Sequence, residues 1–124
     1  MRISGLKLSN YRLHRELSLE FGLGITVLEG ANETGKSTLV EALHRALFLS
    51  SRSSGALLDE MRPQPGGGDP ELTLRFEAEG NSFTLHKRFA GSRGASSLIS
   101  SVGSSFIKVL QLFFGNFFCL LCLC

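Results

Sequence analysis

Residues 30–37 have a spacing of glycines, a lysine and a hydroxyl that can bind phosphate. They read Gly-Ala-Asn-Glu-Thr-Gly-Lys-Ser, which fits the complete pattern G-x-x-x-x-G-K-[ST]. Glycines at both ends let the backbone adopt positive φ and pass close to a ligand, so that its N–H groups form an anion-binding nest. A helix that starts near Lys36 adds the positive end of its dipole. The segment therefore predicts a binding site for nucleotide phosphates.

Three side chains at the end of this loop have roles that follow from their chemistry. Lys36 can reach the β- and γ-phosphates, Ser37 can place its hydroxyl on Mg²⁺, and Thr38 can contact the α-phosphate. Nothing in the pattern reads a base. The expected ligand residues are Gly30, Asn32, Glu33, Thr34, Gly35, Lys36, Ser37 and Thr38, with Ser37 as the metal ligand.

Such a loop needs a strand before it and a helix after it, and the flanking residues predict both. The apolar run at 25–28, Ile-Thr-Val-Leu, predicts a buried strand that continues to residue 29. Glu41 and Arg45 are four positions apart and predict an ion pair on the solvated side of the helix. Residues 38–49 predict this helix, with a buried stripe of Leu39, Val40, Leu43 and Leu47.

The first strand is predicted at residues 2–9, and residues 16–21 alternate apolar and polar side chains as a second strand does. Residues 50–70 are rich in Ser, Gly and Pro and predict a loop, with a short helical turn around 56–61. The connection between helix and later strands is therefore expected to be irregular.

A β-hairpin is predicted after this loop. Residues 71–78 and 82–87 alternate regularly, and Gly80-Asn81 lies between them at hairpin spacing. Two strands thus precede the phosphate-binding strand, and a hairpin follows the helix. Small P-loop kinases and GTPases usually have the loop after their first strand. The order therefore favours an α/β P-loop NTPase of the ABC type, with a half-head and an antiparallel hairpin subdomain.

At this point the residues resemble a known family. Segments 8–12 (Leu-Ser-Asn-Tyr-Arg), 17–21 (Leu-Ser-Leu-Glu-Phe) and 30–43 are similar to the N-terminal ATPase segment of the SMC/SbcC/RecF superfamily. The Asn-Glu-Thr-Gly-Lys-Ser-Thr form of the loop looks most like the prokaryotic SMC-like AAA proteins linked to DNA repair. The run 75–89 resembles the hairpin of that family's β-subdomain, so the resemblance covers about residues 1–95.

The resemblance implies ATP and Mg²⁺ as ligands and a head made of two halves. In the family, the C-terminal half carries the signature motif and Walker B, and two heads close around two ATP molecules. By resemblance, Arg12 approaches the phosphate or adenine side of the nucleotide, and Asn32 faces the partner head. A partner nuclease, DNA, double-strand-break repair and a cytoplasmic, nucleoid-associated location are implied in the same way.

Several features of the family are absent from these 124 residues. There is no Leu-Ser-Gly-Gly signature and no heptad stretch that would form a coiled coil. Asp59-Glu60 resembles the end of a Walker B motif, but too few apolar residues precede it. Neither Gln64 nor Gln111 lies where a Q-loop is expected. We therefore expect a truncated chain that binds ATP and hydrolyses it poorly or not at all alone.

Charge divides the sequence into two parts. All 11 acidic residues lie within 1–79, and Lys108 is the only charged residue from 94 onwards. This predicts an ATPase lobe at 1–95 and an apolar tail rich in Ser, Phe and Cys at 96–124. A tail that is foreign to the family, for example through a frameshift, competes with a marginal membrane anchor at 105–124 and with a segment that docks on a partner.

Two other functions compete with the ATPase half-head. One is a complete small P-loop kinase, and the other is a membrane-associated fragment without enzymatic activity. The cysteines, Cys119, Cys122 and Cys124, lack the second ligand cluster of a zinc site. The histidines, His14, His44 and His86, lie on three different elements and are expected to be solvated or at an edge. A small basic patch around the hairpin would consist of Arg75, Lys87, Arg88 and Arg93, although an ordinary solvated strand face explains them as well.

Overall fold

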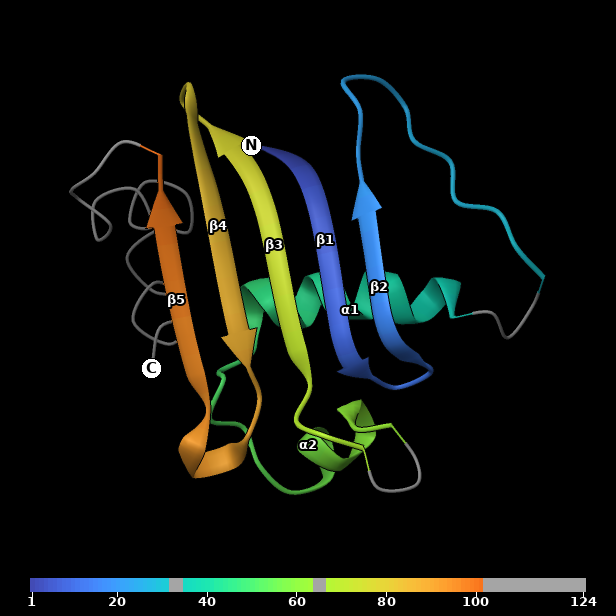
Figure 1. Cartoon of the computed structure of the whole chain (residues 1–124), viewed down its shortest axis with the longest axis vertical. Helices are drawn as coiled ribbons and strands as arrows, with labels where there is room; N and C mark the ends of the chain where they lie inside the picture. Colours follow the sequence, from blue (N-terminus) through green and yellow to red (C-terminus); the bar gives the residue numbers. More distant parts are fainter. Residues whose placement is uncertain (32–34, 64–66, 102–124) are drawn as a thin grey trace.

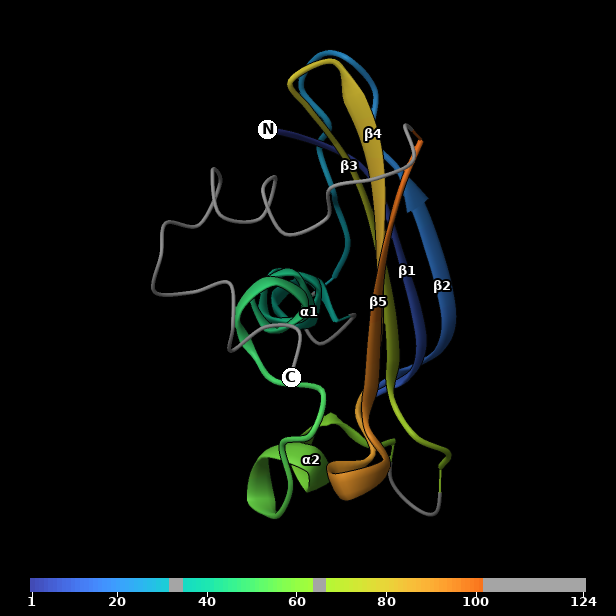
Figure 2. The same cartoon turned by 90° about the vertical axis from the view of Figure 1, so that its left-hand side faces the viewer.

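The computed structural model describes residues 1–31, 35–63 and 67–101, and in these ranges one sheet is covered on one face by a helix. Figure 1 shows helix α1 crossing behind the strands, and Figure 2 shows it on a single side of the sheet. Helix α1 spans Lys36–Phe48, and the shorter α2 spans Ala56–Met61 near one end of the sheet. The strands are β1 (Arg2–Tyr11), β2 (His14–Glu20), β3 (Glu71–Ala78), β4 (Asn81–Arg88) and β5 (Ala95–Ser100), with a short 3₁₀ helix η1 at Gly91–Arg93.

The sheet has the order β2-β1-β3-β4-β5, and every neighbouring pair is antiparallel. The first strand therefore lies inside the sheet and pairs with β2 on one side and β3 on the other. Because α1 lies in the sequence between β2 and β3, the chain leaves the sheet, forms the helix and then returns beside β1. The phosphate-binding pattern thus lies on the connection that crosses the sheet.

Alternation in the strands produces the core, as the sequence predicts. The apolar side chains of β3 and β4 point toward α1, whereas the polar ones that alternate with them lie on the more exposed face; Lys87 of β4 is the exception, because it occupies an inward position. Helix α1 presents Ala42 and Ala46, both at most 1% exposed, to this layer. Such small side chains let the helix axis come close to the sheet. The largest buried members of the core are Tyr11, Phe89, Leu8, Met61, Leu72 and Leu74.

The hairpin is confirmed, with its turn one residue earlier than expected. Glu79 and Gly80 form the turn with φ of 50° and 77°, and Asn81 already belongs to β4, paired with Ala78. Positive φ at both central residues is the type I′ geometry that fits the twist of a two-residue hairpin. The predicted Gly80-Asn81 turn was therefore wrong by one position, because Glu79 accepts the left-handed conformation.

The predicted strand at 25–29 was wrong. These residues are assigned to no strand, and Ile25 and Val27 are 96% and 70% exposed. Figure 1 shows this segment running outside the sheet beside β2 before the chain reaches α1. The sheet of described strands does not include this segment, so its backbone lacks the ladder of hydrogen bonds that defines a strand. Val40, expected in the buried stripe of the helix, is likewise 70% exposed.

Strand β5 was not predicted, and it lies beyond the expected division at residue 95. It pairs with β4 over its full length, from Ala95 opposite Arg88 to Ser100 opposite Phe83. The ATPase lobe at 1–95 and the tail at 96–124 stay a prediction, to which we add that the sheet itself continues through Ser100. The proposed anchor at 105–124 and its three cysteines lie outside the described residues.

Candidate nucleotide-binding site

The phosphate-binding pattern ends at a helix start with the expected geometry. Gly35 is the N-cap of α1 and has φ of 88°, in the left-handed region that favours glycine. The ammonium of Lys36 donates a hydrogen bond to the carbonyl of Gly30, so this side chain reaches across the loop to its first glycine. Ser37 is exposed on the first turn of α1, while Thr38 is 7% exposed. Asn32, Glu33 and Thr34 lie outside the described residues.

His14 of β2 packs directly against this glycine. A Cβ atom added to Gly35 would lie 2.5 Å from Nε2 of His14, closer than any real contact. The same Nε2 atom is buried and has no hydrogen-bond partner in the described part of the chain. His14 was expected to be a solvated or edge histidine, and it lies half-buried on the edge strand β2, where its ring fills the space that a side chain at position 35 would need.

Arg12 is held tightly at the turn between β1 and β2. Its backbone has φ of 49°, an uncommon value for a residue with a side chain. Its N–H donates to the carbonyl of Met61 at 2.9 Å, and its Nε donates to the carbonyl of Glu60 at 3.1 Å. The two terminal nitrogens lie 2.9 and 3.0 Å from the two carboxylate oxygens of Glu41 on α1. The turn is therefore fixed to both helices.

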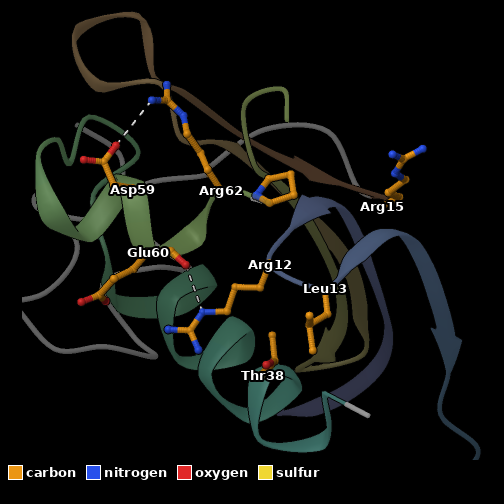
Figure 3. A pocket seen from close by; sticks show the side chains of 8 residues that line it. Arg12, Leu13, Arg15, Thr38, Asp59, Glu60 and Arg62 are labelled. Carbon is orange, nitrogen blue, oxygen red and sulfur yellow. Dashed lines mark hydrogen bonds and ion pairs between the residues drawn. The ribbon is translucent and has the colours of Figure 1, made fainter. Parts of the chain in front are cut away.

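A pocket of about 510 Å³ lies between this turn, α1 and α2. Thr38 and Arg12 share it, so the structure brings the residue predicted from the loop and the residue predicted from the resemblance to one cavity. Figure 3 shows the Arg12 side chain extending over α1 near Thr38, whereas Arg15 points away from it. The remaining lining residues are Leu13, Asp59, Glu60, Arg62 and Pro63.

Ion pairs connect the charged residues Glu41, Arg45 and Glu60 next to the pocket. Arg45, only 11% exposed, pairs with Glu41 one turn earlier on α1 and lies 3.1 Å from a carboxylate oxygen of Glu60. The predicted Glu41–Arg45 pair is confirmed, but it is more buried than an ion pair on a solvated face. Tyr11 lies beside it and is fully buried. Burial raises the pKa of its hydroxyl to about 12, and the negative charge of Glu41 adds to this, against the opposing effect of Arg45 and Arg12.

Asp59-Glu60, which resembles the end of a Walker B motif, lies on the helix α2 and not at the end of a strand. Asp59 is 3.7 Å from Arg62, and Glu60 pairs with Arg45. Gln64 and Gln111 lie outside the described residues. Within the described ranges, no group of three or more His, Cys, Asp or Glu residues is arranged to hold a metal ion.

The basic patch suggested around the hairpin does not form as a surface. Lys87 is fully buried, and its ammonium donates to the carbonyl of Leu49 at 2.8 Å. Arg75 pairs with Glu20, and Arg88 lies 3.9 Å from Asp69. Lys87 occupies an inward position in the alternation of β4, which is why it points away from solvent.

Comparison with known proteins identifies the family. Residues 5–112 match the model of a family described as an AAA domain. The chain belongs to this AAA domain family. It is 32% identical to the DNA double-strand break repair Rad50 ATPase of Halobacterium salinarum over 94 residues, which are 76% of this chain and 10% of that protein. The chain thus spans about a tenth of the length of such curated relatives.

Solved structures of similar fold are ATPase heads. The structure of the recombination mediator protein RecF-ATP superimposes with a TM-score of 0.60 at 18% identity, over 86% of this chain and 29% of that one. The SMC head domain from Thermotoga maritima gives a TM-score of 0.59 at 20% identity, over 90% of this chain and 41% of that one. The family member described here therefore has the α/β fold of P-loop NTPase heads, and its relatives include DNA-repair ATPases.

Two residues of the site were missed by sequence reasoning. Glu41 was assigned only to its helical neighbour Arg45, and its contact with Arg12 joins residues 29 positions apart. The contact between His14 and Gly35 was missed because the two residues are distant in the sequence. Residues 21–31 between them form no strand from which their proximity could have been inferred. Outside the site, no helix among the described residues is long and apolar enough to cross a membrane.

Proposed function

We propose that this chain binds Mg-ATP through residues 30–38 and forms the N-terminal half of an ATPase head. The observation that carries the proposal is the complete loop pattern of residues 30–37, in which Gly35 has φ of 88° and caps the start of a 13-residue helix. This geometry turns the first N–H groups of α1 and the positive end of its dipole toward an anion. Lys36 then supplies a charge for the β- and γ-phosphates.

Mg²⁺ fits the donors that are available. The hydroxyl of Ser37 is exposed in the first turn of α1, next to the lysine expected to contact the phosphates. Mg²⁺ prefers oxygen ligands and keeps several waters, so one hydroxyl together with phosphate oxygens is a suitable set. When bound, the ion neutralises charge on the phosphates. Arg12 and Thr38 line the adjacent pocket, into which the rest of the nucleotide extends.

The isolated chain is expected to hold ATP without turning it over. Phosphoryl transfer needs a group that orients the attacking water and further charges on the γ-phosphate. Asp59 and Glu60, the nearest candidates by sequence, lie on α2 and pair with arginines. We infer that a C-terminal half and a second head supply these groups. Participation in DNA double-strand-break repair, with DNA and a nuclease as partners in the cytoplasm, follows the names of the relatives and the family resemblance.

The apolar residues before the loop support a C-terminal half as partner. Leu23 and Ile25 are 88% and 96% exposed, and Val27 is 70% exposed. Such a run is long enough to form a strand, and its free backbone groups suit a neighbouring strand from another segment.

Nucleotide binding is tested by titrating the full chain with a fluorescent ATP analogue in Mg²⁺. We expect saturable binding that Lys36→Ala lowers by at least about tenfold, equivalent to about 1.4 kcal/mol. Lys7→Ala is the matched control, because Lys7 is an exposed lysine of β1 that pairs with Glu16. Equal binding by the wild type and Lys36→Ala would contradict the proposal. Brisk phosphate release by the chain alone, dependent on Lys36, would contradict the half-head.

A further inference from the structure

Glu41 fixes the direction in which Arg12 points. Its two carboxylate oxygens lie 2.9 and 3.0 Å from the two terminal nitrogens of the Arg12 guanidinium. A planar guanidinium bound by two roughly parallel hydrogen bonds to one carboxylate has a defined orientation, which a single contact does not give. The loop pattern assigns no function to Glu41, which lies on α1 after the phosphate-binding residues.

Glu41 is itself fixed by a second arginine. Arg45 pairs with Glu41 and also lies 3.1 Å from the carboxylate of Glu60, whose carbonyl accepts a hydrogen bond from Nε of Arg12 at 3.1 Å. The four residues therefore form a chain of ion pairs from Arg12 through Glu41 and Arg45 to Glu60, and the hydrogen bond from Arg12 to the backbone carbonyl of Glu60 closes it into a ring. No member can move without breaking a contact to another, so the ring behaves as one unit.

The backbone of Arg12 shows that this arrangement is enforced. A φ of 49° is unfavourable for arginine, and it persists only where the surroundings determine the conformation. The surroundings here are the bond from the Arg12 N–H to the Met61 carbonyl at 2.9 Å and the side-chain bonds to Glu41 and Glu60. The turn is therefore built to present this side chain in one orientation.

We propose that Glu41 is a positioning residue that holds Arg12 ready for the nucleotide. Arginine has five N–H donors, of which Glu41 and Glu60 take three, so two remain for a ligand. Arg12 lines the same pocket as Thr38, and phosphate oxygens are the acceptors that best match a guanidinium. An arginine that is ordered before binding loses less rotamer freedom when the ligand arrives. The inference rests on the proposed function.

The direction in which Glu41→Gln changes the affinity for nucleotide distinguishes two roles of Glu41, positioning Arg12 and competing with phosphate for it. If Glu41 merely competed with phosphate for Arg12, removing its charge would tighten nucleotide binding. If it positions Arg12, Glu41→Gln weakens binding, because the amide nitrogen cannot accept a hydrogen bond and the guanidinium loses its fixed orientation. We expect the dissociation constant for Mg-ATP to rise about threefold to tenfold.

The test is a double-mutant cycle on the full chain, measured by calorimetric titration with Mg-ATP. Glu41→Gln should weaken binding in the wild-type background and change it by less than about twofold in the Arg12→Ala background. Arg12→Lys keeps the charge but not the paired bonds, and it should weaken binding to a similar extent as Glu41→Gln. The matched control is Glu77→Gln, which removes a carboxylate paired with Arg2 at 2.7 Å on the outer strand face.

Each outcome decides the proposal. Unchanged or tighter binding by Glu41→Gln would overturn it, as would an equal loss in both backgrounds. If Glu41→Gln does not fold, the Arg12→Ala and Arg12→Lys variants still decide, because unaltered affinity in both removes any need to position Arg12. Normal binding that depends on Lys36, with no effect of Glu41→Gln, overturns this inference alone. A wild-type chain that binds no nucleotide overturns the proposed function with it.

Discussion

Gly35 satisfies two independent requirements at the start of α1. Its φ of 88° is accessible to glycine at little cost, and the ring of His14 occupies the space that a Cβ would need. The first requirement belongs to every loop of this pattern and is readable from the sequence. The second depends on β2 and becomes visible only when the fold brings residue 14 beside residue 35. One glycine is thus demanded both by its own backbone and by a neighbouring strand.

At the residue scale, the ionisation of the Tyr11 hydroxyl can be measured directly. It is the only tyrosine, and the chain has no tryptophan, so ultraviolet absorbance of tyrosinate reports this hydroxyl alone. Burial raises its pKa from 10.0 to about 12 in the folded chain. We expect a spectrophotometric titration to show ionisation near pH 12 in the native chain and near pH 10 in guanidinium chloride.

The same shift predicts how stability depends on pH. Because the folded pKa is above the unfolded one, the stabilisation is fully present below pH 10 and is lost as the pH rises toward about 12. Tyr11→Phe should therefore remove this part of the alkaline loss, as measured by denaturant unfolding at several pH values. Native titration at the ordinary tyrosine pKa would contradict the buried position of the hydroxyl.

At the scale of elements, Lys87 joins β4 to the far end of α1. Its ammonium is buried and donates to the carbonyl of Leu49, the residue that caps the helix C-terminus. The last carbonyls of a helix lack partners within the helix and carry the negative end of its dipole, so a cation there is favourable. Helix α1 is thus held by Lys87 at its C-terminal end and by Arg12 and Glu60 through its residues Glu41 and Arg45.

Lys87→Met should destabilise the chain by about 1–3 kcal/mol, because a buried acceptor loses a charged donor while the apolar stem is kept. Thermal unfolding followed by circular dichroism gives the measurement. Lys7→Met is the control, since Lys7 is exposed and its ion pair with Glu16 contributes little. Equal stability of Lys87→Met and the wild type would mean that Leu49 gains nothing from this contact.

The elements that the sequence predicted correctly share one property. Strands β1 to β4 and α1 each carry an apolar pattern whose partner lies within the described chain, so the pattern and the burial agree. Residues 25–28 have an equally clear apolar pattern, but they pair with none of the described strands. Val40 has the helical spacing of the apolar stripe but faces solvent. The Ser-rich β5 was missed because Ala95–Ser100 is not an apolar run, and its pairing depends on β4.

At the scale of the whole molecule, the segment between β2 and α1 exposes the large apolar side chains of Leu23, Ile25 and Val27. A soluble monomer rarely leaves several large apolar side chains close together in water, so this segment fits the proposed contact with a C-terminal half. The helix and the hairpin could be predicted from the local sequence, whereas the conformation of residues 25–28 could not, because their apolar pattern is the same as that of a paired strand. The residues expected to bind the nucleotide can therefore be predicted from the sequence, whereas the conformation of the segment before the loop cannot.

Replacing Ile25 and Val27 by serine should separate stability from assembly. Both side chains are largely exposed, so we expect the free energy of unfolding to change by less than about 0.5 kcal/mol. Association with a co-expressed C-terminal half from a related ATPase should nevertheless be lost, as measured by co-purification. Ile99→Ser on β5 is the control, because Ile99 is 62% exposed and lies at the other edge of the sheet. Intact co-purification of the double variant would show that this segment is not the contact.

The position of β1 inside the sheet also sets an order of events during synthesis. Residues Arg2–Tyr11 are made first and can pair at once with β2, but their other edge receives β3 only after Glu71–Ala78 have been made. Chains grow from the N-terminus, and an open strand edge invites pairing with other chains. If the ribosome pauses after α1, the nascent chain therefore exposes the unpaired edge of β1 in a two-stranded ribbon. Pairing of β3 with β1 then covers this edge and prevents it from pairing with other chains.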